Sequence, residues 1–134
     1  GWAVTAVDFS VVGIELGRTL EAQVRVQPIT WVVADLRTWA PGPEPDPGQP
    51  GHAAYDLVLC AFVHLDPPDF ARARTWLAPG GHLVVVSHGP GAPDGPSNPA
   101  YRYDEPQLRA AAEGLDVGLL DQRDDRLVVI ARRR

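Results

Sequence analysis

The sequence predicts an α/β fold built on an open, mostly parallel sheet that ends in an antiparallel hairpin. Short apolar runs rich in β-branched residues alternate with stretches of helical period, which is typical of parallel strands joined by helical crossovers. The last two apolar runs are joined only by residues 121–126. A parallel pair needs a crossover of about a dozen residues or more, so these two strands must run antiparallel.

The first third of the chain predicts a strand, a helix and a second strand. Residues 2–8 form an apolar run that ends on Asp8, and residues 29–35 form another that ends on Asp35. Between them, apolar residues recur near a period of 3.6 over residues 11–24, which predicts a helix. The hydroxyl of Ser10 can accept a hydrogen bond from the first turn of that helix.

The rest of the chain continues the alternation of strands and helices. The expected elements are a strand over 55–61, a helix over 69–77, a strand over 82–88, a helix over about 104–113, and strands over 115–120 and 127–131. Residues 79–81, Pro-Gly-Gly, predict a turn, and the proline-rich residues 40–53 predict a loop. The expected order is β-α-β-β-α-β-α-β-β, in a single domain that covers residues 1–134.

Charge and hydropathy argue against two classes of partner. The net charge is -5, and nucleic-acid binding depends largely on clustered Lys and Arg. The one basic cluster, residues 132–134, is expected to be a frayed and solvated end. The mean hydropathy is -0.12, and no apolar run approaches the roughly 20 residues that span a bilayer. We therefore expect no nucleic-acid or membrane partner and a cytoplasmic location.

Composition also bears on origin and on metals. All basic residues are arginine, which together with 14 prolines predicts a GC-rich bacterial genome. The single cysteine, Cys60, excludes an internal disulfide and a cysteine-built metal site, and it lies inside an apolar run, which predicts buried packing. The histidines have no paired helical spacing, so no metal site is expected.

Two successive predicted strands end in aspartate. In an open parallel sheet, ligands bind beyond the carboxyl ends of the strands, and these ends carry Asp8, Asp35, Ala61 with His64, and His88. A carboxylate at the first end can accept both hydroxyls of a ribose, and one at the second can accept from the exocyclic amine of adenine. The pair would outline an adenosine. The alternative is that each aspartate only caps the helix that follows it.

Five segments in register strengthen the adenosine interpretation. The segments V-T-A-V-D-F-S, V-V-A-D-L, Y-D-L-V-L-C-A-F-V-H-L and L-A-P-G-G-H-L-V-V-V, with the closing hairpin, resemble the class I S-adenosylmethionine-dependent methyltransferases. The likeness is strongest to the small-molecule branch that includes the tellurite-resistance type enzymes. It runs in order over nearly the whole chain. It implies a Rossmann-like fold, S-adenosylmethionine as cofactor and methyl transfer to a small-molecule acceptor.

The resemblance also implies roles for residues that follow the first two strands. Asp8 in V-D-F-S would hold the ribose hydroxyls, with Phe9 packing beside the adenine and Ser10 completing the motif. Asp35 would meet the adenine amine, and Leu36 would lie against the ring. These five residues form the expected adenosine end of the cofactor site.

Residues after the third and fourth strands would complete that site. The resemblance implies that the backbone of Ala61 contacts the methionine part of the cofactor, and that His64 faces the methyl donor or the acceptor. The loop before Tyr101 and Tyr103 would cover the acceptor, although tyrosines at such positions more often pack a loop. His64 and His88 are the only imidazoles at strand ends, so they are the candidate catalytic bases.

The chain departs from the family at one essential place. The family's first strand and its glycine-rich turn, which let the backbone approach the methionine carboxylate, should precede Gly1. In the family's strand order that strand lies between the strand ending at Asp8 and the strand ending at Ala61. Its loss would leave a gap in the sheet and expose strand edges. We therefore expect the chain to bind cofactor poorly, or to need the missing piece.

Two other functions remain open at this point. A nicotinamide-dependent oxidoreductase is one, because an acidic residue after the second strand also marks dinucleotide-binding folds. The Pro-Gly-Gly turn, the second aspartate and the terminal hairpin weigh against it. The other is a non-catalytic or incomplete methyltransferase-like domain, which the missing glycine turn favours. No motif in either loop names the acceptor.

Overall fold

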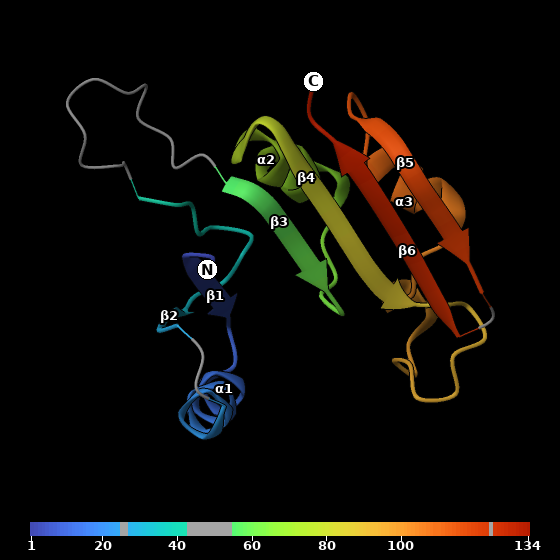
Figure 1. Ribbon diagram of the computed structural model, residues 1–134. Helices are drawn as coiled ribbons and strands as arrows, with labels where there is room; N and C mark the ends of the chain where they lie inside the picture. The colour runs from blue at the N-terminus through green and yellow to red at the C-terminus, as the bar shows by residue number, and fades with distance from the viewer. Residues whose placement is uncertain (25–26, 43–54, 124) are drawn as a thin grey trace. The chain divides into compact units, whose positions relative to one another are not determined.

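The computed structural model describes residues 1–24, 27–42, 55–123 and 125–134. Its helices and strands follow the predicted order (Figure 1). Contacts divide the chain into two compact units, Gly1–Ala40 and Pro41–Arg134, and each is described by itself. Most of the proline-rich segment predicted as a loop lies outside the described residues, and the single domain stays a prediction.

The first unit contains one parallel strand pair and one helix. It consists of β1 (Val4–Asp8), α1 (Val11–Gln23) and β2 (Ile29–Val33). The strands pair in parallel over their full lengths. Ser10 caps α1 as predicted, since the backbone N–H of Gly13 donates to its hydroxyl at 3.0 Å. The capped helix therefore begins directly beyond the end of β1.

Glu21 and Trp31 join the helix of the first unit to β2. The carboxylate of Glu21 accepts from the backbone N–H of Ile29 and from the indole N–H of Trp31, each at 2.6 Å. These two hydrogen bonds lower the pKa of Glu21 below its usual range, and the bond from the Trp31 indole contributes more than the bond from the Ile29 backbone. A Cβ at Gly17 would lie 2.4 Å from the Trp31 ring. The ring can therefore pack against α1 at this position only because Gly17 has no side chain.

The second unit is built on a four-stranded sheet in the order β3-β4-β6-β5. Its elements are β3 (Tyr55–Ala61), α2 (Pro67–Thr75), β4 (Leu77–His88), a short 3₁₀ helix η1 (Pro99–Tyr101), α3 (Glu105–Ala111), β5 (Asp116–Gln122) and β6 (Arg126–Arg132). β3 runs parallel to β4, and β6 runs antiparallel to both β4 and β5. The predicted C-terminal antiparallel hairpin is therefore confirmed.

One face of this sheet forms the core of the second unit. Leu83 and Val85 of β4 lie opposite Ala131 and Val129 of β6, and all four side chains are buried. Helices α2 and α3 pack on this face (Figure 1). Alternation along each strand sends every second side chain to these helices, which explains why the core residues recur at every second position.

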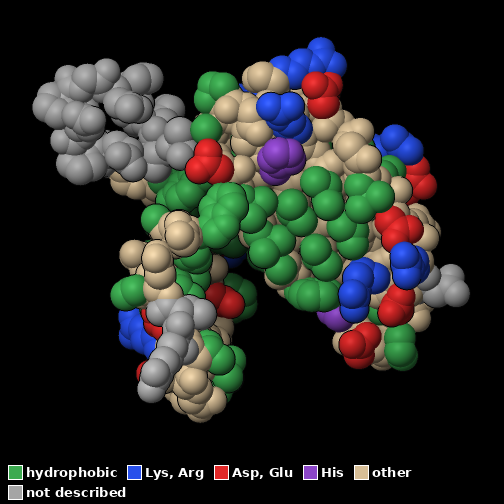
Figure 2. Space-filling model, viewed as in Figure 1, with side chains coloured by type: hydrophobic (Ala, Val, Ile, Leu, Met, Phe, Trp, Pro, Cys, Tyr) green, Lys and Arg blue, Asp and Glu red, His purple; other side chains and the backbone are tan. Residues whose placement is uncertain are grey.

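The opposite face of the sheet carries apolar side chains that no helix of this unit covers. Its residues are exposed or half-buried, and we call them the open face: Leu57, Leu59, Val84, Val86, Leu119, Val128 and Ile130. Figure 2 shows these hydrophobic side chains spread over the sheet. The outer edge of β3 also has no strand partner within the described ranges. The exposed strand edge that the resemblance predicted is present.

The Pro-Gly-Gly segment lies inside β4, although the sequence predicts it as a turn before the strand. The register with β3 jumps from Tyr55 opposite Leu77 to Leu57 opposite His82, so the segment bulges out of the strand pair. Gly80 adopts a φ of +82°, a conformation that glycine takes without a steric penalty. The strand continues on both sides because the bulge absorbs the extra residues.

The C-terminal arginines are ordered, so the prediction of a frayed end is wrong. β6 extends to Arg132. The backbone N–H of Arg133 donates to the carbonyl of Gly81 at 2.8 Å. The guanidinium of Arg134 binds both carboxylate oxygens of Asp116 and holds the pKa of that carboxyl below its usual range. The bulge of β4 and the start of β5 supply partners that the local sequence does not reveal.

Within the described residues, no helix has the length and apolar character that crossing a membrane requires.

The two faces of the sheet predict different responses to truncation. Leu83→Ala, on the core face with 0% exposure, should lower the free energy of unfolding by about 2–5 kcal/mol because it leaves a cavity. Leu59→Ala, on the open face with 57% exposure, should lower it by less than about 1 kcal/mol. Urea unfolding followed by circular dichroism measures both. A loss of similar size for the two variants would show that the open face is buried in solution.

Candidate functional site

The site residues predicted from the sequence are divided between the two units. The first unit holds Asp8, Phe9, Ser10, Asp35 and Leu36, and the second holds Ala61, His64 and His88. In each unit they follow the carboxyl ends of parallel strands. This is the edge at which ligands bind in open α/β sheets.

In the first unit, the two aspartates follow the same end of one strand pair. Asp8 is the last residue of β1 and lies opposite Val33 of β2. The backbone N–H of Ala34 donates to the carbonyl of Asp8 at 3.0 Å. β2 ends at Val33, two residues earlier than the sequence predicts, and Asp35 follows this hydrogen bond immediately. The structure therefore brings the two predicted positions to one edge.

Both carboxylates also stabilise the turns in which they lie. Asp8 accepts from the backbone N–H of Ser10 at 2.8 Å. Asp35 accepts from the backbone N–H of Arg37 at 2.9 Å and from its guanidinium at 2.7 Å. The turn-capping role considered as an alternative is thus present. An ionised carboxylate offers about four acceptor positions, so the bond to Ser10 leaves Asp8 able to accept from a ligand. The adjacent ring of Phe9 is 76% exposed.

In the second unit, β3 ends in an unusual backbone conformation. Ala61 lies opposite Val86 of β4 and is followed by Phe62, which has a φ of 54°. The backbone N–H of Phe62 donates to the carbonyl of Val86 at 2.8 Å. Its ring is 56% exposed and lies 4.8 Å from the ring of His88. No feature of the local sequence predicted this role for Phe62, because residues other than glycine rarely adopt this conformation.

His64 lies between two tyrosines. Its ring stacks on Tyr103 at 5.2 Å and meets the ring of Tyr101 edge-on at 5.3 Å. Its Nε2 lies 3.8 Å from a carboxylate oxygen of Asp66. Its Nδ1 is buried without a hydrogen-bond partner in the described part of the chain. The imidazole is therefore held by ring contacts, with one nitrogen directed toward a carboxylate.

Tyr103 fixes the segment that carries His64. Its hydroxyl accepts from the backbone N–H of Leu65 at 2.5 Å and donates to the carbonyl of Leu65 at 2.9 Å. Burial raises the pKa of Tyr103 to about 12, so its hydroxyl stays protonated at neutral pH. Tyr103 packs this loop in place, which is the more common role considered for it.

Arg102 holds two parts of the loop after β4 together. The guanidinium of Arg102 donates to the carbonyls of Pro90 and Pro96 at 2.7 and 2.8 Å. His88, the last residue of β4, lies 3.9 Å from a carboxylate oxygen of Asp94 in this loop, measured from Nδ1. Both candidate bases therefore lie beside a carboxylate.

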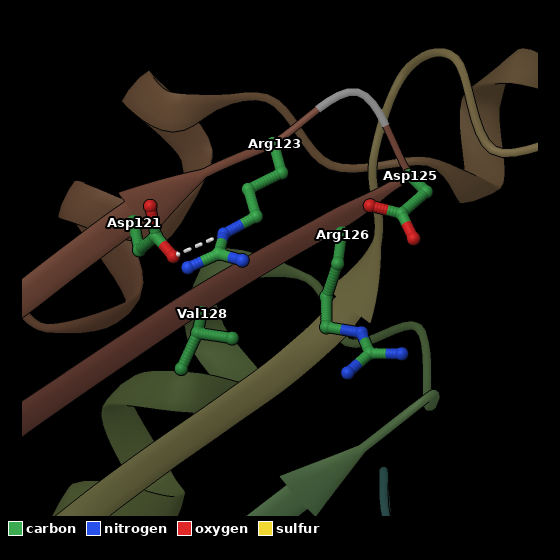
Figure 3. Close-up of a pocket in the computed structure, with 5 residues that line it drawn as sticks. All are labelled: Asp121, Arg123, Asp125, Arg126 and Val128. Carbon is green, nitrogen blue, oxygen red and sulfur yellow. Dashed lines mark hydrogen bonds and ion pairs between the residues drawn. The ribbon is translucent and has the colours of Figure 1, made fainter.

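Three other features do not add to the candidate site. Cys60 is buried, and burial raises its pKa to about 11, so the thiol is inert at neutral pH. No cluster of His, Cys, Asp and Glu suited to a metal occurs among the described residues. A surface depression at the turn between β5 and β6 (Figure 3) is lined by Asp121, Arg123, Asp125, Arg126 and Val128. Arg123 pairs with Asp121 there at 2.9 Å.

The chain has the fold of S-adenosylmethionine-dependent methyltransferases. It matches the N-methyltransferase NodS from Bradyrhizobium japonicum WM9 with a TM-score of 0.69 and 20% identity, over 98% of this chain and 73% of that one. It matches a SAM-dependent methyltransferase from Aquifex aeolicus with a TM-score of 0.73 and 14% identity, over 98% and 69% of the two chains. The predicted fold class is confirmed.

A third similar structure is TehB from Haemophilus influenzae, with a TM-score of 0.71 and 12% identity. It is matched by 100% of this chain, which spans only 51% of TehB. NodS is also known in complex with S-adenosyl-L-homocysteine, and this chain spans 66% of that structure. No protein-family model matches the sequence, and no curated protein matches it significantly. The chain thus corresponds to about half to three quarters of each of these structures.

Tyr103→Phe should destabilise the second unit. The variant leaves the backbone groups of Leu65 without their partner, which should lower the free energy of unfolding by about 1–3 kcal/mol. Tyr101→Phe, whose ring is 53% exposed, is the matched control and should change little. Denaturant unfolding at neutral pH measures both, and equal stabilities would contradict the assigned role of Tyr103.

Tyr103 should also make the free energy of unfolding depend on pH in the alkaline range. The pKa of Tyr103 is about 12 in the folded protein, and that of an unfolded tyrosine is about 10. The stabilisation is complete below the unfolded value and is lost as the pH rises toward the folded value. The phenolate absorbance of the wild type should include one tyrosine that ionises late, and Tyr103→Phe should lack it.

Proposed function

We propose that this chain belongs to an S-adenosylmethionine-dependent methyltransferase that acts on a small-molecule acceptor. The observation that carries the proposal is the pair of carboxylates, Asp8 and Asp35, at the carboxyl edge of the strand pair in the first unit. Support comes from the fold, which the chain shares over nearly all its length with methyltransferases, and from the complex of NodS with S-adenosyl-L-homocysteine.

In this proposal the first unit binds the adenosine part of the cofactor. Asp8 accepts the ribose hydroxyls, Phe9 packs beside the adenine, and Ser10 fixes the turn. Asp35 accepts from the adenine amine, with Leu36 against the ring. The acceptor positions that the turn leaves on Asp8 and the exposed ring of Phe9 suit such a ligand.

The second unit would hold the reacting groups. The backbone at Ala61 contacts the methionine part, and His64 or His88 takes a proton from the acceptor. The cofactor, when bound, supplies a methyl group on a sulfonium that is already a good leaving group. The main task of the protein is then to align the nucleophile with the methyl and the sulfur. An imidazole is suited to act as a base at neutral pH.

The proposal includes a strand and a glycine-rich turn outside residues 1–134. Among the described residues no strand is followed by a G-x-G turn and a helix, and the outer edge of β3 has no partner among the described strands. We therefore expect the chain to bind cofactor weakly through its adenosine end. The bacterial origin and the cytoplasmic location inferred from composition remain predictions.

Calorimetry with S-adenosyl-L-homocysteine and with NAD tests the proposal. S-adenosyl-L-homocysteine should bind more tightly than NAD. Asp8→Asn should weaken its binding about tenfold or more, since a hydrogen bond to a charged group contributes about 1.5–3 kcal/mol. Asparagine keeps an acceptor for the N–H of Ser10, so the turn persists. Asp56→Asn, at an exposed position in β3, should leave binding unchanged.

The alternatives give different outcomes in the same experiment. Tighter binding of NAD would favour the oxidoreductase. Binding of S-adenosyl-L-homocysteine without methyl transfer, in a chain extended by the missing strand and turn, would favour a non-catalytic module. Equal affinities of the wild type and Asp8→Asn for S-adenosyl-L-homocysteine would contradict the proposed adenosine site.

A further inference from the structure

We propose that the second unit recognises an amine, which is the methyl acceptor of the proposed function. The site is a group of four rings and two carboxylates at the carboxyl ends of β3 and β4, which we call the ring cluster: Phe62, His64, Asp66, His88, Asp94 and Tyr101. All of them belong to one unit. The identification of the amine as the acceptor rests on the proposed function, whereas the binding of an amine does not.

The ring cluster consists of two similar triplets. In one, the Phe62 ring lies 4.8 Å from the ring of His88, whose Nδ1 lies 3.9 Å from Asp94. In the other, Tyr101 lies 5.3 Å from the ring of His64, whose Nε2 lies 3.8 Å from Asp66. Each triplet thus joins an exposed aromatic ring, an imidazole and a carboxylate. β3 and β4 are adjacent, so their ends bring the triplets to the same edge of the sheet.

The conformation of Phe62 indicates a function outside the core. A φ of 54° is disfavoured for any residue with a Cβ. The side chain gains little from burial, since Phe62 is 56% exposed. Strain of this kind persists at binding sites, where the surrounding structure holds a side chain toward a ligand. Here the strain holds an aromatic face beside His88.

The charges of the ring cluster favour a cation. The carboxylates of Asp66 and Asp94 are 73% and 82% exposed, so a ligand can reach them. The faces of aromatic rings attract cations through their quadrupole. The nearby guanidinium of Arg102 already binds the carbonyls of Pro90 and Pro96. An ammonium group therefore suits the site better than a carboxylate or a neutral alcohol does.

The imidazoles give the site a means of activating an amine. His64 or His88 takes a proton from the bound ammonium, and its neighbouring carboxylate stabilises the imidazolium. The free lone pair on nitrogen then forms the N–C bond to the methyl group as the C–S bond breaks. The electron pair of that bond stays on sulfur, and the product leaves as a methylated ammonium. Proton and charge are balanced.

Three probes that share one ring and differ in charge test the inference: benzylammonium, benzyl alcohol and benzoate. Titrating each into the 134-residue chain while recording the imidazole proton resonances of His64 and His88 gives a dissociation constant. Benzylammonium should bind about threefold or more tightly than benzyl alcohol, as a cation–π contact predicts, and benzoate should bind most weakly. His82, in the middle of β4 and opposite Leu57 of β3, is the internal control and should not shift.

Two pairs of variants locate the binding. Phe62→Gly removes the ring and relieves the positive φ, so it should keep the fold and abolish the preference for benzylammonium. The control Trp2→Ala removes another exposed aromatic ring, 63% exposed, and should keep that preference. Asp94→Asn should reduce the preference, whereas Asp56→Asn should not.

The possible results separate this inference from the proposed function. Equal or tighter binding of benzyl alcohol or benzoate, or an unchanged preference in Phe62→Gly, overturns the amine site whatever the cofactor experiment shows. A preference for benzylammonium that depends on Phe62 supports the site even if S-adenosyl-L-homocysteine fails to bind. In that case the result contradicts only the assignment of the amine as the methyl acceptor.

Discussion

The structure of the second unit depends on the pairing of β4 with two neighbours of opposite direction. β3 runs parallel to β4 on one side, and β6 runs antiparallel on the other. The parallel pair requires the crossover through α2, which places that helix on one face of the sheet. The same pairing brings the carboxyl ends of β3 and β4 together, so the residues that follow, from Phe62 to His64 and from His88 onward, meet at one edge.

In the second unit, helices cover one face of the sheet and leave the other face exposed. Side chains such as Leu83 and Val129 are fully enclosed by α2 and α3, whereas Leu59 and Leu119 on the open face reach solvent. Monomeric soluble proteins rarely leave broad apolar surfaces uncovered. This asymmetry, and an outer edge of β3 that has no partner among the described strands, agree with the partial coverage of NodS and TehB.

Side-chain hydrogen bonds hold in place the loops that follow β3 and β4 at the edge of the sheet. Tyr103 holds the segment after β3 through both backbone groups of Leu65, and Arg102 holds the loop after β4 through two carbonyls. These anchors lie next to the candidate bases His64 and His88 without being bases themselves. The buried phenol of Tyr103 and the guanidinium of Arg102 hold the two loops in position, whereas the imidazoles of His64 and His88 lie beside carboxylates.

The sequence by itself determined the order of elements, the cap at Ser10, the antiparallel hairpin and the aspartates at two strand ends, because apolar period, short links and capping residues act over a few positions. Only the tertiary structure decided the positive φ of Phe62, the bulge at Gly80, the pairing of Arg134 with Asp116 and the ring contacts of His64. Each of these depends on a partner from a distant part of the chain or on a backbone angle that residue type does not encode. Such contacts exist only once the strands are paired.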